Sequence, residues 1–209
     1  MSRIGPILAG AAVVALSGGI YIMTRPQAGD DQFAQCRTAQ VAGGTSQIGG
    51  PFELVSETGE TVTDADVIDQ PALIYFGYTF CPDVCPLDAA RNSQAVDILE
   101  SRGKMVKPVF ISIDPARDTP EVLAEFTGYM HPRMLGLTGS PEQVKAASQA
   151  YRTYFKKQEP EEGDEEFYLV DHSTFTYLAL PEHGFVEFFR RDTTAEQMAD
   201  SVACFMENR

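Results

Sequence analysis

Short apolar runs alternate with amphipathic stretches along most of the chain, and this alternation predicts a domain with both strands and helices. Strands are predicted where apolar or β-branched runs are bounded by turn residues, at 52–55, 61–63, 72–78, 107–113, 135–138, 167–170, 174–180 and 185–189. Helices are predicted where apolar residues recur at helical spacing, at 87–101, 120–130, 143–155 and 193–207. The order predicts an α/β fold, a mixed central sheet flanked by helices, with an N-terminal hairpin extension.

The start of the chain has a different pattern. Residues 4–23 contain no charged residue and are flanked by arginines, and about 20 apolar residues are enough to cross a bilayer as a helix. No small-residue cleavage site follows, which favours a single N-terminal transmembrane helix at 1–25 over a cleaved signal peptide. Residues 26–47, rich in Gln, Gly, Ala and Thr, are predicted to be a flexible tether, and 48–209 the folded domain.

The charges around this anchor predict its orientation. Acidic residues soon follow the arginine at its far end, which predicts a cytoplasmic N-terminus and an exported C-terminal domain. No Arg-rich and Ser-rich presequence precedes the apolar stretch, so the sequence favours a bacterial inner membrane with the domain in the periplasm. That compartment is oxidising, and disulfides persist there.

Composition and charge exclude several classes of protein. The 209 residues are 44% hydrophobic and 22% charged, which excludes a disordered or low-complexity chain. The formal net charge of -14 argues against nucleic acid as a partner, because such binding is carried largely by Lys and Arg. An acidic surface suits a basic protein partner or a cation.

The segment TFCPDVCPLD, residues 79–88, carries the clearest chemical signal. It joins a predicted buried strand to a predicted helix, and α/β folds place their sites at such strand ends. Cys81 and Cys85 are close in the chain, and the proline after Cys85 places that thiol near the positive end of the helix dipole, which favours a thiolate. A structural disulfide, a redox dithiol and a metal-binding pair all remain open, although the usual redox spacing is C-x-x-C.

A metal site would require a third ligand, and the chain has three histidines. His172 lies between two predicted strands, whereas His131 lies at a helix end and His183 in a hairpin turn. Two thiolates and one imidazole form a soft site that suits copper better than magnesium or calcium. A structural zinc site would normally need a fourth ligand.

Taken together, these segments resemble the Sco/SenC family of thioredoxin-like, membrane-anchored copper chaperones. The resemblance covers 48–208 and rests on GGPF at 49–52, YFGYT at 75–79, CPDVCP at 81–86, SIDP at 112–115, RDTP at 117–120 and VDHS at 170–173. It implies a thioredoxin-like fold and one copper ion per chain, Cu(I) or Cu(II), bound by Cys81, Cys85 and His172. It also implies delivery of that copper to the copper-centre subunit of cytochrome c oxidase.

The resemblance permits a second role for the same thiols. They could reduce a disulfide of the recipient through a mixed disulfide, and other periplasmic copper chaperones or thiol reductants would then be further partners.

Two aspartates adjoin the implied ligands. Because neighbouring side chains of a strand point to opposite faces, Asp171 is expected to shape the site rather than bind metal. Asp83 is expected either to contact lysines of a partner or to cap a turn.

Two further features lie outside the motif. Cys36 and Cys204 are the remaining cysteines, and we predict a structural disulfide between them because leftover cysteines commonly pair in an oxidising compartment. The acidic cluster at 159–166 is interpreted as a solvated loop or, alternatively, as a segment that docks a basic partner or moves with copper occupancy.

The main hypothesis is therefore a copper metallochaperone. The alternative is a periplasmic thiol-disulfide oxidoreductase or thiol peroxidase on the same fold. Such enzymes usually place a cis-proline opposite their cysteines, but the segment 167–180 contains no proline, and His172 within it favours metal. A copper or redox sensor is allowed by the same residues.

Overall fold

The computed structural model describes residues 31–37, 47–159 and 167–209. The predicted anchor at 1–25, much of the predicted tether and nearly all of the acidic cluster lie outside the described residues. Among the helices that the structure describes, none is both long and apolar enough to cross a membrane.

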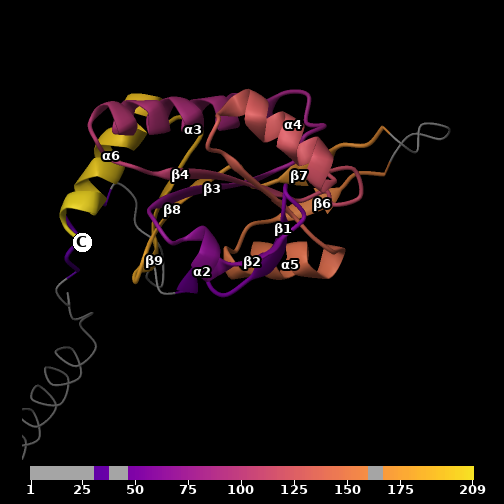
Figure 1. The fold of residues 1–209 in the computed structure, drawn as a ribbon, viewed down its shortest axis with the longest axis horizontal. Helices are drawn as coiled ribbons and strands as arrows, with labels where there is room; N and C mark the ends of the chain where they lie inside the picture. Colours follow the sequence, from indigo (N-terminus) through magenta and orange to yellow (C-terminus); the bar gives the residue numbers. More distant parts are fainter. Residues whose placement is uncertain (1–30, 38–46, 160–166) are drawn as a thin grey trace, which may run out of the picture. The chain divides into compact units, whose positions relative to one another are not determined.

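A seven-stranded mixed sheet runs through the domain (Figure 1). Its strand order is β2-β1-β5-β4-β3-β8-β9; β3, β4 and β5 are parallel, and every other pairing is antiparallel. The predicted hairpin is β1 and β2, which joins the sheet through β5. The fold is thus a mixed α/β, thioredoxin-like fold, as predicted. The strands are β1 (Glu53–Ser56), β2 (Thr61–Thr63), β3 (Ala72–Gly77), β4 (Lys107–Ser112), β5 (Leu135–Thr138), β8 (Thr176–Leu180) and β9 (Gly184–Phe189).

The central strands β3 and β4 determine where the site can form. Every residue of β3 is buried, as expected for a central strand whose two faces are both covered. The parallel register pairs Ala72 with Lys107 and Gly77 with Ser112, so the carboxyl ends of both strands lie at the same edge of the sheet. The cysteine loop follows β3 at that edge.

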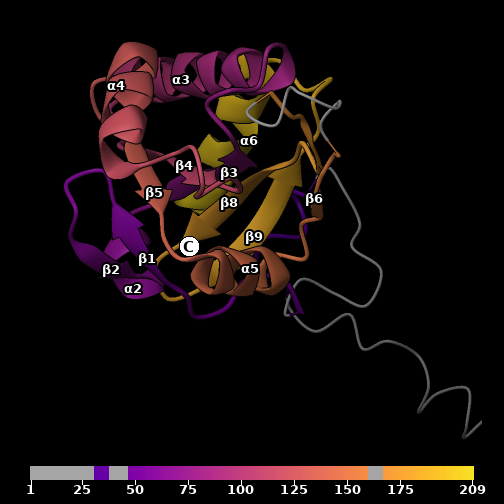
Figure 2. The ribbon, with the colours of Figure 1, turned by 90° about the vertical axis from the view of Figure 1, so that its right-hand side faces the viewer.

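Helices cover both faces of the sheet. Figures 1 and 2 show α3, α4 and α6 on one face and α2 and α5 on the other. Thr119, Ser140 and Thr194 cap three of these helices by accepting a hydrogen bond from a backbone N–H of the first turn, which satisfies a donor that has no partner within the helix. The helices are α2 (Asp64–Val67), α3 (Val84–Ser101), α4 (Pro120–Met130), α5 (Pro141–Ala150) and α6 (Ala195–Glu207).

Two predicted elements differ in the structure. The helix predicted at 143–155 ends at Ala150, and Arg152 follows with a left-handed φ of 51°, a conformation that breaks a helix. The chain then forms β6 (Phe155–Lys157), which pairs with β7 (Val170–His172) in a separate two-stranded sheet. The strand predicted at 167–170 therefore begins only at Val170. The pairing joins residues distant in sequence, so local periodicity gives no signal for it.

The helix predicted at 87–101 also begins earlier than expected. It starts at Val84 and places Pro86 in its first turn, where a missing N–H costs nothing because that group has no partner within the helix. This earlier start places Cys85 inside the helix.

A short stretch before the main domain packs against α6. Phe33 is buried, with its ring centroid 5.2 Å from that of Phe205, and a disulfide joins Cys36 to Cys204 with their Cα atoms 5.6 Å apart. This part of the segment that composition predicts to be a tether therefore contributes to the core. Two apolar side chains in a polar segment produce no periodic pattern that would predict this packing.

Candidate metal centre

Three of the predicted site residues come together beyond the carboxyl end of β3. Cys81 lies in the loop after β3, Cys85 in the first turn of α3, and His172 at the end of β7. One ligand atom from each residue lies within 4.8 Å of the other two. The fold thus brings Cys85 and His172, which are 87 positions apart in the chain, into one potential coordination sphere.

The imidazole of His172 is oriented by the backbone. Its Nδ1 lies 2.9 Å from the carbonyl oxygen of Ser173, and since a carbonyl only accepts, Nδ1 carries the proton. The unprotonated Nε2 then faces the sulfur of Cys85 at 3.3 Å. A second hydrogen bond that fixes the tautomer in this way is the usual arrangement for a histidine that binds metal.

The two thiols have different surroundings. The sulfur of Cys81 accepts a hydrogen bond from the backbone N–H of Cys85 at 3.4 Å, at the start of α3. A hydrogen bond from the Cys85 thiol, together with the backbone N–H groups of Asp83 and Cys85, lowers the pKa of Cys81 well below that of an ordinary thiol. The hydrogen bond with Cys81, followed by burial, raises the pKa of Cys85. Cys81 is therefore the thiolate of the metal-free pair, whereas the sequence assigned that role to Cys85.

The site is also more enclosed than an exposed loop would be. Cys81 is 8% exposed and Cys85 is fully buried, while His172 is half-buried. The rings of Tyr75 and Tyr78 meet the imidazole edge-on, with centroids 6.2 and 5.8 Å away. Because Cys85 is fully buried, the exposed surface of the ligand group belongs to Cys81 and His172.

Gly77 is required by this close packing. A Cβ at this position would lie 2.7 Å from a ring carbon of Tyr75 and 3.1 Å from the sulfur of Cys85. Only glycine therefore lets the end of β3 approach the second cysteine so closely.

A buried carboxylate holds the start of the cysteine loop. Asp118 is fully buried and accepts hydrogen bonds from the backbone N–H of Thr79 at 3.1 Å, the hydroxyl of Thr79 at 2.6 Å and the hydroxyl of Ser112 at 2.5 Å. Burial raises the pKa of Asp118, and these hydrogen bonds oppose that effect. This carboxylate thereby connects the ends of β3 and β4.

A second buried carboxylate, Asp114, organises the aromatic residues around the loop. It accepts a hydrogen bond from the hydroxyl of Tyr168 at 2.7 Å and pairs with Arg117 at 2.5 Å. The guanidinium of Arg117 lies 3.6 Å from the ring centroid of Tyr168 and 4.8 Å from that of Phe80. The sequence places Asp114, Arg117 and Asp118 in motifs but predicts no role for them, because their partners come from distant elements.

Asp83 and Asp171 lie outside the group of ligand atoms that the structure brings together. Asp171 is exposed and accepts a hydrogen bond from the side chain of Gln158 at 2.7 Å, so it connects β7 to the residue that follows β6. Asp83 occupies the residue before α3, but its side chain makes no capping hydrogen bond. It is exposed at the rim of the site.

The other two histidines have different neighbours. The Nδ1 of His131 accepts a hydrogen bond from the backbone N–H of Arg133 at 3.1 Å, so in the neutral ring Nε2 carries the proton and faces Asp97 at 3.4 Å. His131 thus has no free lone pair for a metal, although Asp97 and Glu100 lie close to it. His183 packs edge-on against Phe33 at 5.2 Å.

The arrangement can hold a soft metal ion in a pocket with a restricted opening. Two thiolate sulfurs and one neutral imidazole nitrogen converge, and this donor set suits copper. These features define a class: a thioredoxin-like domain that presents two cysteines and a histidine for metal where a strand meets a helix. The family model described as SCO1/SenC matches residues 40–207, and the chain belongs to the SCO1/SenC family.

Similar proteins and solved structures agree with this assignment. Protein SenC of Rhodobacter capsulatus is 54% identical over 206 residues, which are 99% of this chain and 91% of SenC. The mitochondrial SCO1 homolog 1 of Arabidopsis thaliana is 42% identical over 160 residues, 76% of this chain and 47% of that protein, so the match spans about half its length. The crystal structure of Arabidopsis thaliana ScoI with copper bound has a TM-score of 0.71 and 41% identity, covering 77% of this chain and 99% of that chain. The predicted resemblance is confirmed.

Proposed function

We propose that this protein is a copper metallochaperone that binds one copper ion through Cys81, Cys85 and His172. The observation that carries the proposal is the oriented imidazole, whose unprotonated Nε2 lies 3.3 Å from the Cys85 sulfur. The copper-bound relative from Arabidopsis thaliana supports copper as the metal. Copper is the cargo, and the recipient is the copper-centre subunit of cytochrome c oxidase, as the family resemblance implies.

The enclosure of the site suggests how copper leaves. Cys85 is fully buried, whereas His172 is half-buried and is the one neutral ligand of the three. An incoming thiolate of the recipient therefore replaces His172 first, and a second one then displaces Cys81. The buried Cys85 releases the copper last, so the ion remains bound to at least one protein throughout the exchange.

The proposed location follows from the anchor and the cysteines. We place the domain in the periplasm, tethered to a bacterial inner membrane by the apolar segment 1–25, with the N-terminus in the cytoplasm. The disulfide between Cys36 and Cys204 supports an oxidising compartment.

The test is a copper-transfer measurement with the full chain in detergent micelles. The chain is loaded with Cu(I) and mixed with the reduced, metal-free soluble domain of the oxidase copper-centre subunit. A chelator in solution captures any copper that dissociates. We expect copper to reach the recipient despite the chelator, and expect His172→Ala to lose its copper to the chelator while His183→Ala behaves as wild type. Copper that passes only through the chelator would contradict direct delivery.

A second function, reduction of a recipient disulfide, is favoured by the asymmetry of the thiol pair. The Cys81 thiolate would attack one sulfur of the recipient disulfide, and the Cys85 thiolate would resolve the mixed disulfide. The recipient gains two electrons, and the chain gains a Cys81–Cys85 disulfide. The proton of Cys85 passes to one leaving thiolate of the recipient, and water supplies the proton of the other. Stoichiometric reduction of the oxidised recipient by the metal-free chain would establish this role, whether it serves assembly or redox sensing.

A further inference from the structure

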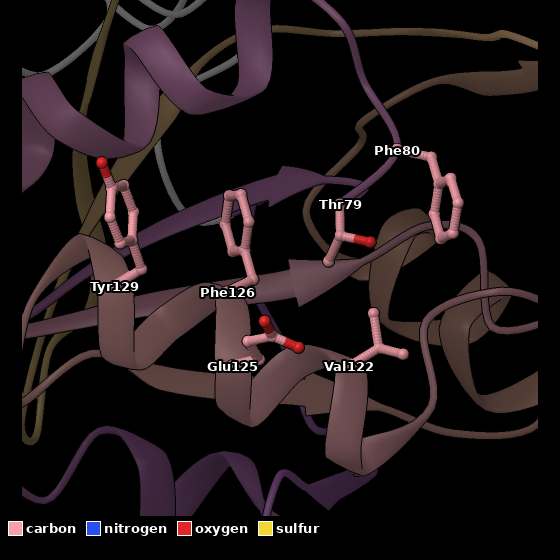
Figure 3. Close-up of a pocket in the computed structure, with 6 residues that line it drawn as sticks. All are labelled: Thr79, Phe80, Val122, Glu125, Phe126 and Tyr129. Carbon is pink, nitrogen blue, oxygen red and sulfur yellow. The ribbon is translucent and has the colours of Figure 1, made fainter.

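An apolar groove lies directly beside the cysteine loop. Its volume is about 390 Å³, and its lining side chains come from the start of the loop and from one face of α4, at positions i, i+3, i+4 and i+7 of that helix. Figure 3 shows these side chains facing a shared space. The lining residues are Thr79, Phe80, Val122, Glu125, Phe126 and Tyr129.

The groove presents aromatic surface that folding has not buried. Phe80 is 54% exposed and Tyr129 is 86% exposed, and clustered exposed aromatic groups mark surfaces that bind partners. The ring of Phe80 is nevertheless held in place, because the guanidinium of Arg117 lies 4.8 Å from its centroid. Phe126, at the base, packs against Phe110 with centroids 4.8 Å apart. A preformed wall of this kind lowers the entropy cost of binding.

The groove adjoins the loop that carries Cys81, because Thr79 and Phe80 of that loop line it. Phe80 is the neighbour of Cys81 in the chain, and an incoming cysteine must approach from the side of Cys81 and His172 because Cys85 is buried. An extended segment advances about 3.3 Å per residue, so residues a few positions from that cysteine lie over the groove. The carboxylate of Glu125 on the groove lining and the net charge of -14 both favour a basic group in such a segment.

We propose that this groove docks the segment of the recipient that carries its copper-accepting cysteine, in extended form. The segment places an apolar side chain between Phe80 and Tyr129 and a Lys or Arg against Glu125. The inference rests on the proposed delivery function, and it specifies how the recipient is selected.

The experiment measures binding of the reduced, metal-free copper-centre domain to the full reduced chain in detergent micelles. The groove variants are Tyr129→Ser and Glu125→Lys. Their controls are Met105→Ser, half-exposed at the opposite end of the sheet, and Glu142→Lys, on α5 across the sheet. We expect each groove variant to raise Kd about tenfold, and each control to change it less than about twofold. Copper stoichiometry remains that of wild type in all four.

The outcomes separate this inference from the proposed function. An unchanged Kd in both groove variants overturns the groove as a docking site, even if copper transfer proceeds. Absence of binding by the wild-type chain overturns it as well. If the wild type binds the recipient but does not transfer copper, the proposed delivery function is wrong, and the comparison of Kd values still tests the docking site. If sedimentation shows that Tyr129→Ser only turns a dimer into a monomer, the occupant is a second copy of the chain and the inference is wrong.

Discussion

The two cysteines of the centre illustrate how surroundings give one residue type two properties. Cys81 lies in the loop just before α3, and its sulfur accepts a backbone N–H together with a hydrogen bond from the Cys85 thiol. Cys85 lies one turn later, fully buried against Gly77 and Tyr75. The first sulfur is stabilised as an anion, and the second retains its proton until a metal or an electrophile arrives.

This difference predicts selective alkylation of the metal-free, reduced chain. A lowered pKa means that the thiolate of Cys81 persists as pH falls below the range where ordinary thiols ionise, so its alkylation by iodoacetamide remains nearly constant down to about pH 6. An ordinary thiol loses about tenfold in rate per pH unit over the same range. Mass spectrometry of the labelled peptides measures both sites. Labelling of Cys85 before Cys81, or a tenfold loss per unit at Cys81, would contradict the assignment.

At the scale of elements, the cysteine loop is held between the ends of β3 and β4. Asp118 bonds to Thr79 at the start of the loop and to Ser112 at the end of β4, while Asp114 and Arg117 hold the aromatic side chains above it. The geometry of the proposed copper ligands thus depends on carboxylates that do not touch them.

Removing the Asp118 carboxylate tests this dependence. Asp118→Ala leaves buried donors of Thr79 and Ser112 without their acceptor, so the free energy of unfolding should fall by about 2 to 4 kcal/mol. Asp118→Asn keeps one acceptor oxygen and should lose less. Asp200→Ala removes an exposed carboxylate paired with Arg102, and this variant should change the free energy of unfolding by less than about 1 kcal/mol. Urea unfolding measures all three. Equal losses in Asp118→Ala and Asp200→Ala would refute the role of Asp118.

The elements that sequence predicted well are those with a local signal. The apolar runs of β3 and β4 and the Thr119 and Ser140 caps with their following prolines are properties of adjacent residues, and they lie where predicted. The β6–β7 pair was not predicted, because its hydrogen bonds join segments separated along the chain.

The candidate site, like the fold, could be predicted only as far as its features have a local signal in the sequence. The convergence of Cys81, Cys85 and His172 could be expected only from the family resemblance, since the spacing of the cysteines left several functions open. The choice of Cys81 as the thiolate and the role of Asp118 depend on backbone and side-chain contacts across elements, which periodicity does not encode.

At the scale of the whole molecule, the disulfide joins the two ends of the described domain. Cys36 and Cys204 are 168 residues apart, so the bond constrains nearly the whole domain when it is unfolded. Phe33 packs beside it against Phe205, and this contact attaches the stretch before the domain to α6. The proposed copper centre lies on other elements, so we expect the disulfide to support stability rather than metal binding.

Replacing both cysteines by alanine should therefore lower stability without changing copper binding. The chain-entropy model gives about 5 kcal/mol for a loop of this length, and we expect a loss of that order in urea unfolding of the oxidised, metal-free chain. Wild type in the presence of reductant serves as the control and should approach the double variant. A wild-type transition that is insensitive to reductant, or Cys36 and Cys204 found as free thiols by peptide mapping, would contradict the prediction.

X-ray absorption at the copper edge tests the central claim most directly. The full chain in detergent micelles is loaded with one equivalent of Cu(I), and its spectrum is compared with those of His172→Ala and His183→Ala. Two sulfur ligands and one nitrogen ligand are expected in wild type and in His183→Ala, and the nitrogen should be lost in His172→Ala. Copper held by sulfur alone in wild type, or a nitrogen that remains in His172→Ala, would contradict the proposed centre.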